Sequence, residues 1–479
     1  MKTYDYYCTW QAQNIFCQEK GVSNRDYLDE NALFNEQNGL VHAFPECRKD
    51  LYFILDDGWD VFYSKNTKES YPFASHILKK DRFLHFHGKP QEKLKQLVDK
   101  ILSYGWKGVG IWVCAQGYEK AYSYSVKRLK SFFKKRLLWS KYANISYWKV
   151  DWGVYGNDWS FRKMLTALAK QIYPELIIEN TLCIPPVNGF NGDEELSLQY
   201  QFPWNQNMKK YIDKVCKISE VFRSYDVTEE LSTTTTLARL CYLLKQNNSI
   251  INCEDEVYLG AILGCSLGIE RNKMCAKSPI TPLSSFHYRY HEAVAAMRYR
   301  SISFAFAKAK LHLSKETFMD EVPFGPYWSE NVSNQLVKQV CPARVSRNTS
   351  LPKVKKIKEV PYVVCAKDYN HNYAIGTFKR LNHEEDEKYE IDVSVQIDEP
   401  IDNLAIFSNH IRQLKAHFLK PLQMKKLILV DLINLTKKDV TSFIKVQNNT
   451  LTIPYSSLTS SFVCDDASSK AYLLKIEKE

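Results

Sequence analysis

The sequence lacks the cysteine and histidine patterns that hold metal ions or redox centres. None of the 13 cysteines forms a Cys-x-x-Cys pair, and the closest histidine pair, His85 and His87, has no third histidine nearby. We therefore expect no metal site. An odd number of cysteines, spread through apolar segments, favours buried free thiols over a disulfide framework and predicts a reducing compartment.

No apolar run approaches the length of a membrane span, and Met1–Tyr7 contains no apolar core of a secretion signal. These absences predict a cytoplasmic protein with no membrane partner. The net charge is +11, with one dense basic run at Lys353–Lys358. We interpret this run as a solvated surface segment and predict no nucleic-acid partner. The sequence leaves open whether the chain forms a homo-oligomer.

What is present is ordinary globular composition with many aromatic rings. The 479 residues are 45% apolar and 25% charged, and the length predicts at least two domains. Aromatic residues make up 13% of the chain, including 30 Tyr and 10 Trp. Rings at this density serve a core, and they also line sugar-binding sites.

Strand-like and helix-like segments alternate over about the first 300 residues, which is typical of parallel βαβ units. Eight such pairs predict a TIM barrel. The expected strands are 6–10, 51–55, 108–113, 147–151, 176–179, 221–223, 250–252 and a weak one at 278–281. A helix is expected over 257–267, between the last two.

The pattern changes to short alternating runs after about residue 361, separated by Asn, Asp and Lys clusters. These runs predict a small C-terminal antiparallel β-sandwich domain. The expected strands are 362–365, 373–378, 389–397, 427–430, 450–453 and 471–474. We place the catalytic barrel in residues 1–350 and the β domain in residues 351–479.

One stretch, Tyr147–Gly153, carries the strongest indication of chemistry. It reads as a buried strand that ends in Asp151 and is broken by Gly153. Acids at the C-terminal ends of barrel strands point into the region where barrel enzymes keep their active sites. Lys149 shares a strand face with Asp151, so we expect its ammonium to keep that carboxylate ionised. Capping of the next helix is the alternative role for Asp151.

Polar and aromatic residues also mark most of the other predicted strand ends. They are Trp10 on the first strand, Asp56, Asp57 and Trp59 after the second, Trp112 in the third, Glu179 on the fifth, Arg223 and Asp226 on the sixth, and Asp255 after the seventh. All would gather at one end of the barrel. A ring of carboxylates with Trp walls suits a sugar, because aromatic faces stack on sugar rings and carboxylates accept hydrogen bonds from hydroxyls. Glycoside hydrolysis needs two carboxyl groups, and we choose Asp151 and Asp226.

These motifs resemble the α-galactosidase (melibiase) superfamily of retaining glycoside hydrolases, including its raffinose-synthase-like branch. Cys8-Thr9-Trp10 is similar to that branch's first-strand motif, and Asp56-Asp57-Gly58-Trp59 to the Asp-Asp-Gly-Trp that binds galactose hydroxyls. Lys149-Val150-Asp151 matches the nucleophile motif Lys-x-Asp. Arg223-Ser224-Tyr225-Asp226 resembles the Arg-x-x-Asp that carries the acid/base. Asn252-Cys253-Glu254-Asp255 aligns with Asn-Asp-Pro-Asp, with Cys253 in place of the first Asp.

The resemblance implies a retaining α-glycosidase for an α-galactoside-like glycoside or oligosaccharide, with Asp151 as nucleophile and Asp226 as acid/base. Substrate-binding roles fall to Trp10, Asp56, Asp57, Trp59, Trp112, Lys149, Glu179, Arg223 and Asp255. No cofactor is expected, because two carboxylates suffice. If the configuration is retained, the Asp151 and Asp226 carboxyl groups should lie about 5–5.5 Å apart.

Three alternative functions stay open from the sequence. The first is a transglycosidase of the raffinose-synthase kind, in which an acceptor sugar replaces water. The second is a different glycone, such as α-N-acetylgalactosamine or another modified hexose. The third is a barrel that binds sugar without catalysis.

Overall fold

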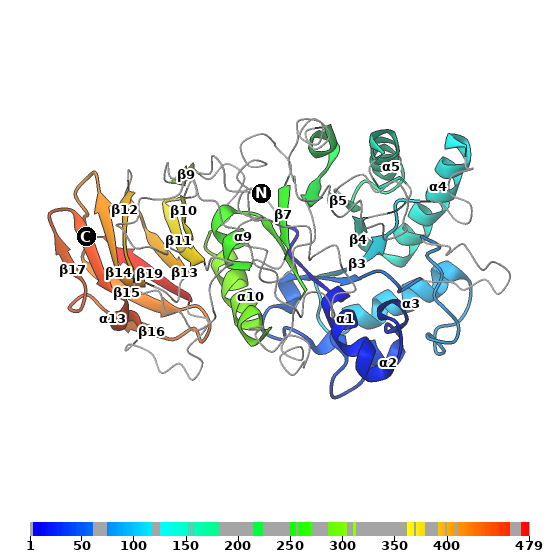
Figure 1. Ribbon diagram of the computed structural model, residues 1–479, viewed down its shortest axis with the longest axis horizontal. Helices are drawn as coiled ribbons and strands as arrows, with labels where there is room; N and C mark the ends of the chain where they lie inside the picture. The colour runs from blue at the N-terminus through cyan, green and yellow to red at the C-terminus, as the bar shows by residue number, and fades with distance from the viewer. Residues whose placement is uncertain are drawn as a thin grey trace, which may run out of the picture.

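The computed structural model describes residues 3–60, 74–116, 125–151, 153, 155–156, 158–181, 214–223, 250–254, 257–270, 286–303, 310–312, 362–367, 370–378, 391–397, 400–407, 411–459 and 471–478. Figure 1 shows two parts: a barrel with helices around it, and β-sheets at the C-terminal end of the chain.

Eight parallel strands close into one barrel in sequence order, which confirms the predicted TIM barrel. They are β1 (Tyr6–Cys8), β2 (Tyr52–Leu55), β3 (Gly108–Val113), β4 (Ile145–Val150), β5 (Ile177–Thr181), β6 (Val221–Arg223), β7 (Ile250–Glu254) and β8 (Ser266–Ile269). Parallel pairing of β1 with both β2 and β8 closes the ring. We call the C-terminal ends of these strands the mouth.

Helices surround the strands wherever the sequence has apolar residues at helical spacing. In the described residues they include α1 (Trp10–Lys20), α2 (Glu30–Phe34), α3 (Pro90–Leu102), α4 (Val126–Ala143), α5 (Trp159–Ile172), α9 (Val257–Leu263) and α10 (Phe286–Arg300), with 3₁₀ turns at Asn24–Asp26, Leu40–His42 and Arg48–Asp50. Helix α5 begins where the Asp158 carboxylate accepts hydrogen bonds from the backbone N–H groups of Ser160 and Phe161.

The eighth strand is not where the sequence predicts it. The expected helix over 257–267 ends at Leu263, and β8 follows at once, before the predicted 278–281 segment, which lies outside the described residues. Gly264, with φ +74°, turns the chain from helix to strand. A continuous apolar run hides this change, because helix and buried strand look alike in a short apolar segment.

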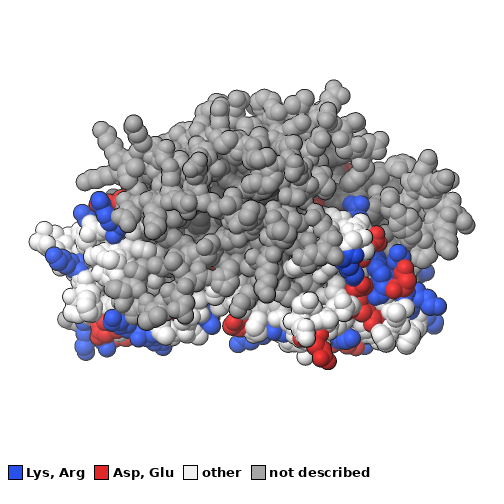
Figure 2. All heavy atoms as spheres, turned by 60° about the horizontal axis from the view of Figure 1, so that its bottom comes forward, with Lys and Arg blue, Asp and Glu red and all other residues white. Residues whose placement is uncertain are grey.

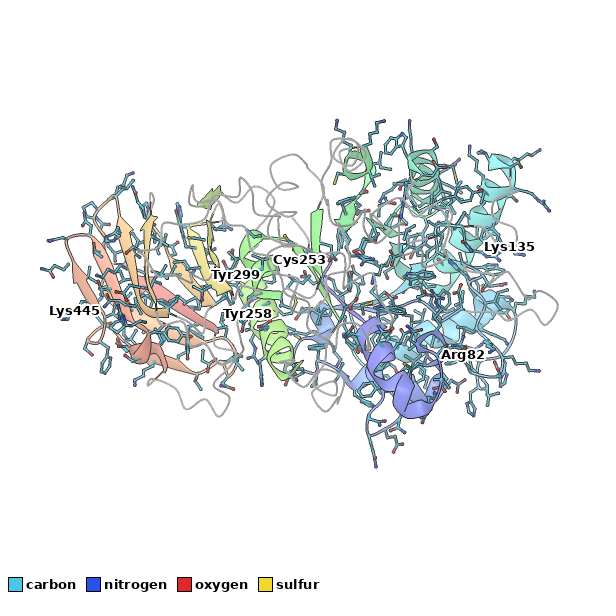
Figure 3. All side chains as sticks on the ribbon, viewed as in Figure 1. Arg82, Lys135, Cys253, Tyr258, Tyr299 and Lys445 are labelled. Carbon is cyan, nitrogen blue, oxygen red and sulfur yellow. The ribbon has the colours of Figure 1, made fainter. Side chains whose placement is uncertain are left out.

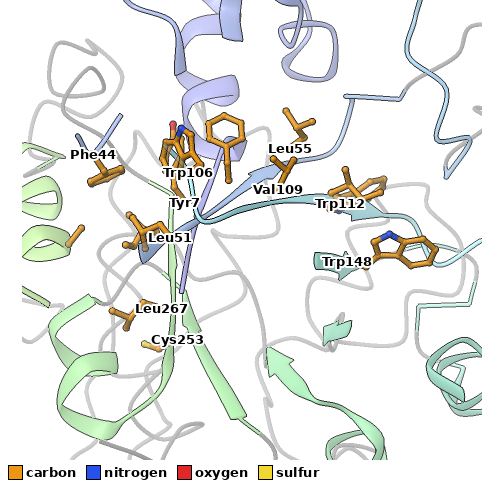
Figure 4. Packing of buried hydrophobic residues seen from close by; sticks show 14 of the residues in the cluster. Tyr7, Phe44, Leu51, Leu55, Trp106, Val109, Trp112, Trp148, Cys253 and Leu267 are labelled. Atoms are coloured by element: carbon orange, nitrogen blue, oxygen red, sulfur yellow. The ribbon is translucent and has the colours of Figure 1, made fainter. Parts of the chain in front are cut away.

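The pleat of each strand decides which side chains line the barrel interior. Tyr6, Ile54 and Tyr147 form one small interior cluster, while their strand neighbours Tyr7, Phe53 and Trp148 belong to the core beneath the helices. Residues two positions further on, such as Lys149 after Tyr147, therefore point inward one level closer to the mouth. Figure 4 shows part of the core beneath the helices.

Two sheets form the C-terminal part and enclose a core of their own. The seven-stranded sheet contains β9 (Lys310–His312), β10 (Tyr362–Lys367), β11 (Asn372–Phe378), β13 (Asn403–Phe407), β15 (Lys426–Asp431), β16 (Lys437–Asp439) and β19 (Ala471–Glu477). The other contains β12 (Ile391–Ile397), β14 (Ile411–Phe418), β17 (Lys445–Gln447) and β18 (Thr450–Pro454), followed by the short helix α13 (Tyr455–Thr459).

The predicted sandwich is confirmed, but its sheets are mixed and not purely antiparallel. Strand β11 pairs with β13 in parallel, and β12 pairs with β14 in parallel, while the other ladders are antiparallel. Between β11 and β13 the chain passes through β12 of the other sheet, and between β12 and β14 it passes through β13. Each pair can therefore run in parallel, because its two strands are not joined by a hairpin. The predicted domain boundary near residue 350 lies outside the described residues and stays a prediction.

Aromatic rings join the sheets to the barrel. The ring of Phe407 lies 4.8 Å from that of Tyr258 on α9 and 5.3 Å from that of Tyr299 on α10, measured between centroids. Figure 3 labels both tyrosines, and Figure 1 shows α9 and α10 between the barrel and β11 and β13. Ala374 and Ala405 on the sheet belong to the same core as the barrel helices, and their small side chains allow close approach.

The described surface carries charges of both signs. On the face shown in Figure 2, Lys and Arg side chains lie among Asp and Glu side chains wherever the atoms are described. None of the helices in the described ranges is long and apolar enough to cross a membrane. The basic run at 353–358 falls outside those ranges.

Candidate active site

Asp56 lies at the mouth and is held by four groups. Its Oδ2 accepts hydrogen bonds from Lys149 Nζ at 2.8 Å and from the Cys8 thiol at 2.9 Å. Its Oδ1 accepts the backbone N–H of Asp57 at 2.7 Å, and its own backbone N–H donates to Thr9 Oγ1 at 3.0 Å. Because the carboxylate is buried, these donors hold it in a single orientation.

Asp57 is buried beside Arg25, whose Nε donates to Asp57 Oδ2 at 2.9 Å. Its other oxygen, Oδ1, is buried without a hydrogen-bond partner in the described structure. Burial raises the pKa of this carboxyl to about 7, although Arg25 opposes the shift. Gly58, with φ +103°, lets the Arg25 backbone approach, because a Cβ there would lie 2.3 Å from the Arg25 carbonyl oxygen.

Asp151 follows β4, and the side chains of Trp112 and Arg223 lie beside its carboxylate. Trp112 Nε1 donates to Asp151 Oδ2 at 3.1 Å, and Arg223 Nη2 lies 3.3 Å from the same oxygen. The backbone of the strand end is held by the buried Arg162 of α5, which donates to the carbonyl oxygens of Val150 and Asp151 at 2.6 and 2.8 Å. The carboxylate is thus positioned on rigid structure, which a nucleophile requires.

Glu179 lies below the mouth and accepts hydrogen bonds on both oxygens. Tyr147 Oη and Asn252 Nδ2 donate to Oε2 at 2.5 and 3.0 Å, and Arg223 Nε donates to Oε1 at 3.0 Å. Arg223 also donates to Thr181 Oγ1 at 2.9 Å. Glu179 therefore positions Arg223 against Asp151, and its predicted direct contact with substrate stays a prediction.

Lys149 pairs with two carboxylates at the mouth. Its Nζ lies 2.8 Å from Asp56 Oδ2 and 3.8 Å from Glu270 Oε1, while Arg223 Nη2 lies beside Asp151. Lys149 and Asp151 share the inward face, as the pleat requires. The predicted effect of Lys149 on the ionisation of Asp151 stays a prediction.

The tryptophans lie at different depths. Trp59 and Trp112 are fully buried, and Trp59 Nε1 donates to the Trp112 carbonyl oxygen at 2.9 Å. Trp10 is partly buried and begins α1, so it follows the first strand and does not end it. Trp112 acts on Asp151 through its indole N–H; the stacking of all three rings on a sugar stays a prediction.

Asp226 and Asp255 lie outside the described residues, and so does the predicted separation between Asp226 and Asp151. Their roles stay predictions. Cys253, which stands where the similar family motif has an Asp, points toward helix α9 and away from the barrel interior. A Cβ at Gly260 of α9 would lie 2.8 Å from Cys253 Cβ. Figure 4 places Cys253 beside Leu267, on the helix side of the barrel wall.

Sequence reasoning missed several residues at this site. Arg25 and Arg162 lie in a turn and a helix, and no strand pattern marks them. Cys8 was noted only within a motif, yet its Sγ lies 3.4 Å from Lys149 Nζ. Glu270 follows the misplaced eighth strand, and recognition of the Ser266–Ile269 strand would have identified it as a strand-end acid. The eight cysteines in the described ranges are buried free thiols, as the sequence predicts.

Two buried acids near the mouth should make stability depend on pH. Burial raises the pKa of Asp57 to about 7 and that of Asp60 to about 6, from 3.8. At a pH between 3.8 and the raised pKa of each group, the folded chain binds more protons than the unfolded chain, so the free energy of unfolding falls as pH rises. Asp57→Asn, which stays neutral, should gain stability relative to the wild type as the pH rises from about 4 to about 7, by at most about 1.4 kcal/mol per pH unit.

Thermal unfolding across this pH range measures that difference, with Asp81→Asn at an exposed position as the control. A stability difference between Asp57→Asn and the wild type that stays constant with pH would contradict the raised pKa.

Among known proteins, the chain is similar only to proteins of solved structure. No family model and no curated protein matches the chain. A β-L-arabinopyranosidase of glycoside hydrolase family 27 from Geobacillus stearothermophilus is 10% identical, with a TM-score of 0.46, covering 99% of this chain and 96% of that one. A protein assigned as an α-N-acetylgalactosaminidase from Bacillus halodurans is 12% identical, with a TM-score of 0.43 and 100% and 97% coverage.

A third solved structure, assigned as an α-galactosidase from Bacteroides fragilis, is 8% identical, with a TM-score of 0.42, covering 100% of this chain and 80% of that one. At these identities and TM-scores, what the chain does has to be inferred from the residues at its own barrel mouth.

Proposed function

We propose that the chain is a retaining α-glycosidase that removes a terminal α-linked galactose or a related hexose from an oligosaccharide or glycoconjugate. The observation that carries the proposal is the arrangement of Asp151. This carboxylate stands at the C-terminal end of a barrel strand, with Trp112 and Arg223 beside one oxygen, and the Lys149–Asp56 pair lies at the same end of the barrel.

The residues support a two-step reaction. Asp151 attacks the anomeric carbon as the bond to the leaving oxygen breaks, and Asp226 gives that oxygen its proton. Water then attacks the same carbon, Asp226 takes the water's proton, and the bond to Asp151 breaks. Asp56, Asp57 and Lys149 suit the sugar hydroxyls, because they are buried, oriented donors and acceptors at the mouth.

A panel of nitrophenyl α-glycosides tests the proposal, with α-galactoside expected to be cleaved fastest and with net retention of configuration. Product analysis with added acceptor sugars separates hydrolysis from sugar transfer. Absence of turnover on every α-glycoside of the panel would overturn the proposal.

The role of Asp226 can be tested separately. Asp226→Asn should lose much less rate on a nitrophenyl galactoside than on an unactivated galactoside, because nitrophenolate hardly needs protonation. Azide needs no base to attack, so it should restore rate to this variant; because it attacks the β-linked glycosyl-enzyme from the opposite face, the product should be an α-linked glycosyl azide. Equal losses on both substrates without azide rescue would place the acid/base elsewhere, and Asp255→Asn is the matched variant to assay next.

A further inference from the structure

Glu270, directly after β8, points into the barrel at the level of the mouth. Two residues earlier, a Cβ on Gly268 would meet Tyr6 Oη at 2.8 Å and Asn252 Oδ1 at 2.9 Å, so this face of β8 lines the interior. Leu267 packs on the opposite side, against Gly260 of α9. Alternation along the strand therefore turns Glu270 inward, one level above Gly268, and its side chain is only 7% exposed.

The Glu270 carboxylate shares one ammonium group with Asp56. Lys149 Nζ lies 3.8 Å from Glu270 Oε1 and 2.8 Å from Asp56 Oδ2, with Cys8 Sγ at 3.4 Å. Three adjacent strands bring these groups together: Glu270 follows β8, Cys8 ends β1 and Asp56 follows β2. Lys149 belongs to β4, which lies four strands from β8, on the opposite side of the ring. The ammonium therefore reaches across the barrel and meets a carboxylate on each side of β1.

An ammonium that is 1% exposed needs its charge balanced by neighbouring groups. Asp56 and Glu270 both supply negative charge beside it. A buried carboxylate this close to a lysine at the proposed sugar site is a candidate for a role in that site.

We propose that Glu270 is a positioning residue of the active site: it fixes the Lys149 ammonium from the side opposite Asp56, so that Lys149 meets a hydroxyl of the glycone in one orientation. This inference rests on the proposed glycosidase function and adds a residue to its sugar-binding wall. The extra negative charge also suits the positive charge that develops on the sugar ring in the transition state.

The test compares Glu270→Gln, Glu270→Asp and wild type on nitrophenyl α-galactoside. Glu270→Gln should lower kcat/KM by roughly 10- to 100-fold, mostly through a higher KM, because the hydroxyl contact is made in the ground state as well. Glu270→Asp should recover part of the loss. Removal of one anion should also move the alkaline limb of the kcat/KM profile to lower pH, because the charged form of Lys149 loses support.

Other titratable groups near Lys149 stay the same in all three proteins: Asp56 on β2, Cys8 on β1, Tyr147 on β4 and Glu179 on β5. Asp5→Asn serves as the matched control, because Asp5 is a buried carboxylate at the opposite end of the same barrel, where it accepts the Leu267 backbone N–H at 2.8 Å. This control should lose thermal stability and keep the wild-type kcat/KM and pH profile.

The outcomes separate the two proposals. An active wild type with an unchanged Glu270→Gln variant would overturn the role of Glu270 and leave the glycosidase function standing. A Glu270→Gln variant that loses kcat/KM only in proportion to folded protein, with an unmoved alkaline limb, would equally overturn it. A wild type without turnover on any α-glycoside would overturn both.

Discussion

Asp151→Asn should lower kcat by at least roughly 10⁴-fold on every α-glycoside the wild type cleaves, whatever the leaving group. The nucleophile forms the covalent bond to the sugar, so a good leaving group cannot compensate for its absence. The amide oxygen of Asn can still accept the hydrogen bond from Trp112 and lie beside the Arg223 guanidinium, as Asp151 Oδ2 does, so the site should keep its geometry.

Steady-state kinetics on a nitrophenyl and an unactivated galactoside measures the loss. Asp158→Asn is a matched control in the same loop, because Asp158 caps α5 and Asn caps helices about as well. It should keep wild-type kinetics. A loss for Asp151→Asn that shrinks with a better leaving group would instead assign Asp151 to proton transfer, and a loss under tenfold would remove it from the chemistry.

Arg223→Met should cost both stability and activity, because the buried guanidinium supports two carboxylates. Its Nε lies 3.0 Å from Glu179 and its Nη2 3.3 Å from Asp151, and Arg223 is fully buried. Removal of one partner from a buried ion pair costs about 3–5 kcal/mol. We also expect kcat/KM to fall by roughly 10²- to 10³-fold, because Asp151 loses an oriented donor.

The double variant Arg223→Met/Glu179→Gln separates the two effects. Neutralisation of Glu179 removes the unpaired buried charge, so part of the lost free energy of unfolding should return. Activity should stay low, because Asp151 still lacks the guanidinium. Chemical denaturation and kcat/KM on the same preparations measure both, and full recovery of activity in the double variant would show that Arg223 supports only the fold.

Local residue patterns were enough to predict the barrel, most of its strand ends and most of the acids at the mouth. Inward and outward faces alternate along a strand, and parallel strands place their C-terminal ends together, so Asp56, Lys149, Asp151 and Arg223 could be assigned to one site before any coordinates. Local residue types also predicted the short strands of the C-terminal sheets, because alternation and turn residues are local properties.

Which charged groups meet depends on how the folded chain packs. Lys149 pairs with Asp56 and Glu270, and Arg223 takes the place beside Asp151, because long side chains cross the barrel to strands that are distant in sequence. The same holds for Arg162, which reaches the end of β4 from a helix. Glu270 could not be predicted as a strand-end acid, because a four-residue strand inside an apolar run shows no periodicity that distinguishes it from a helix. The strand before Glu270 is recognised only from its pairing with β1, which closes the barrel.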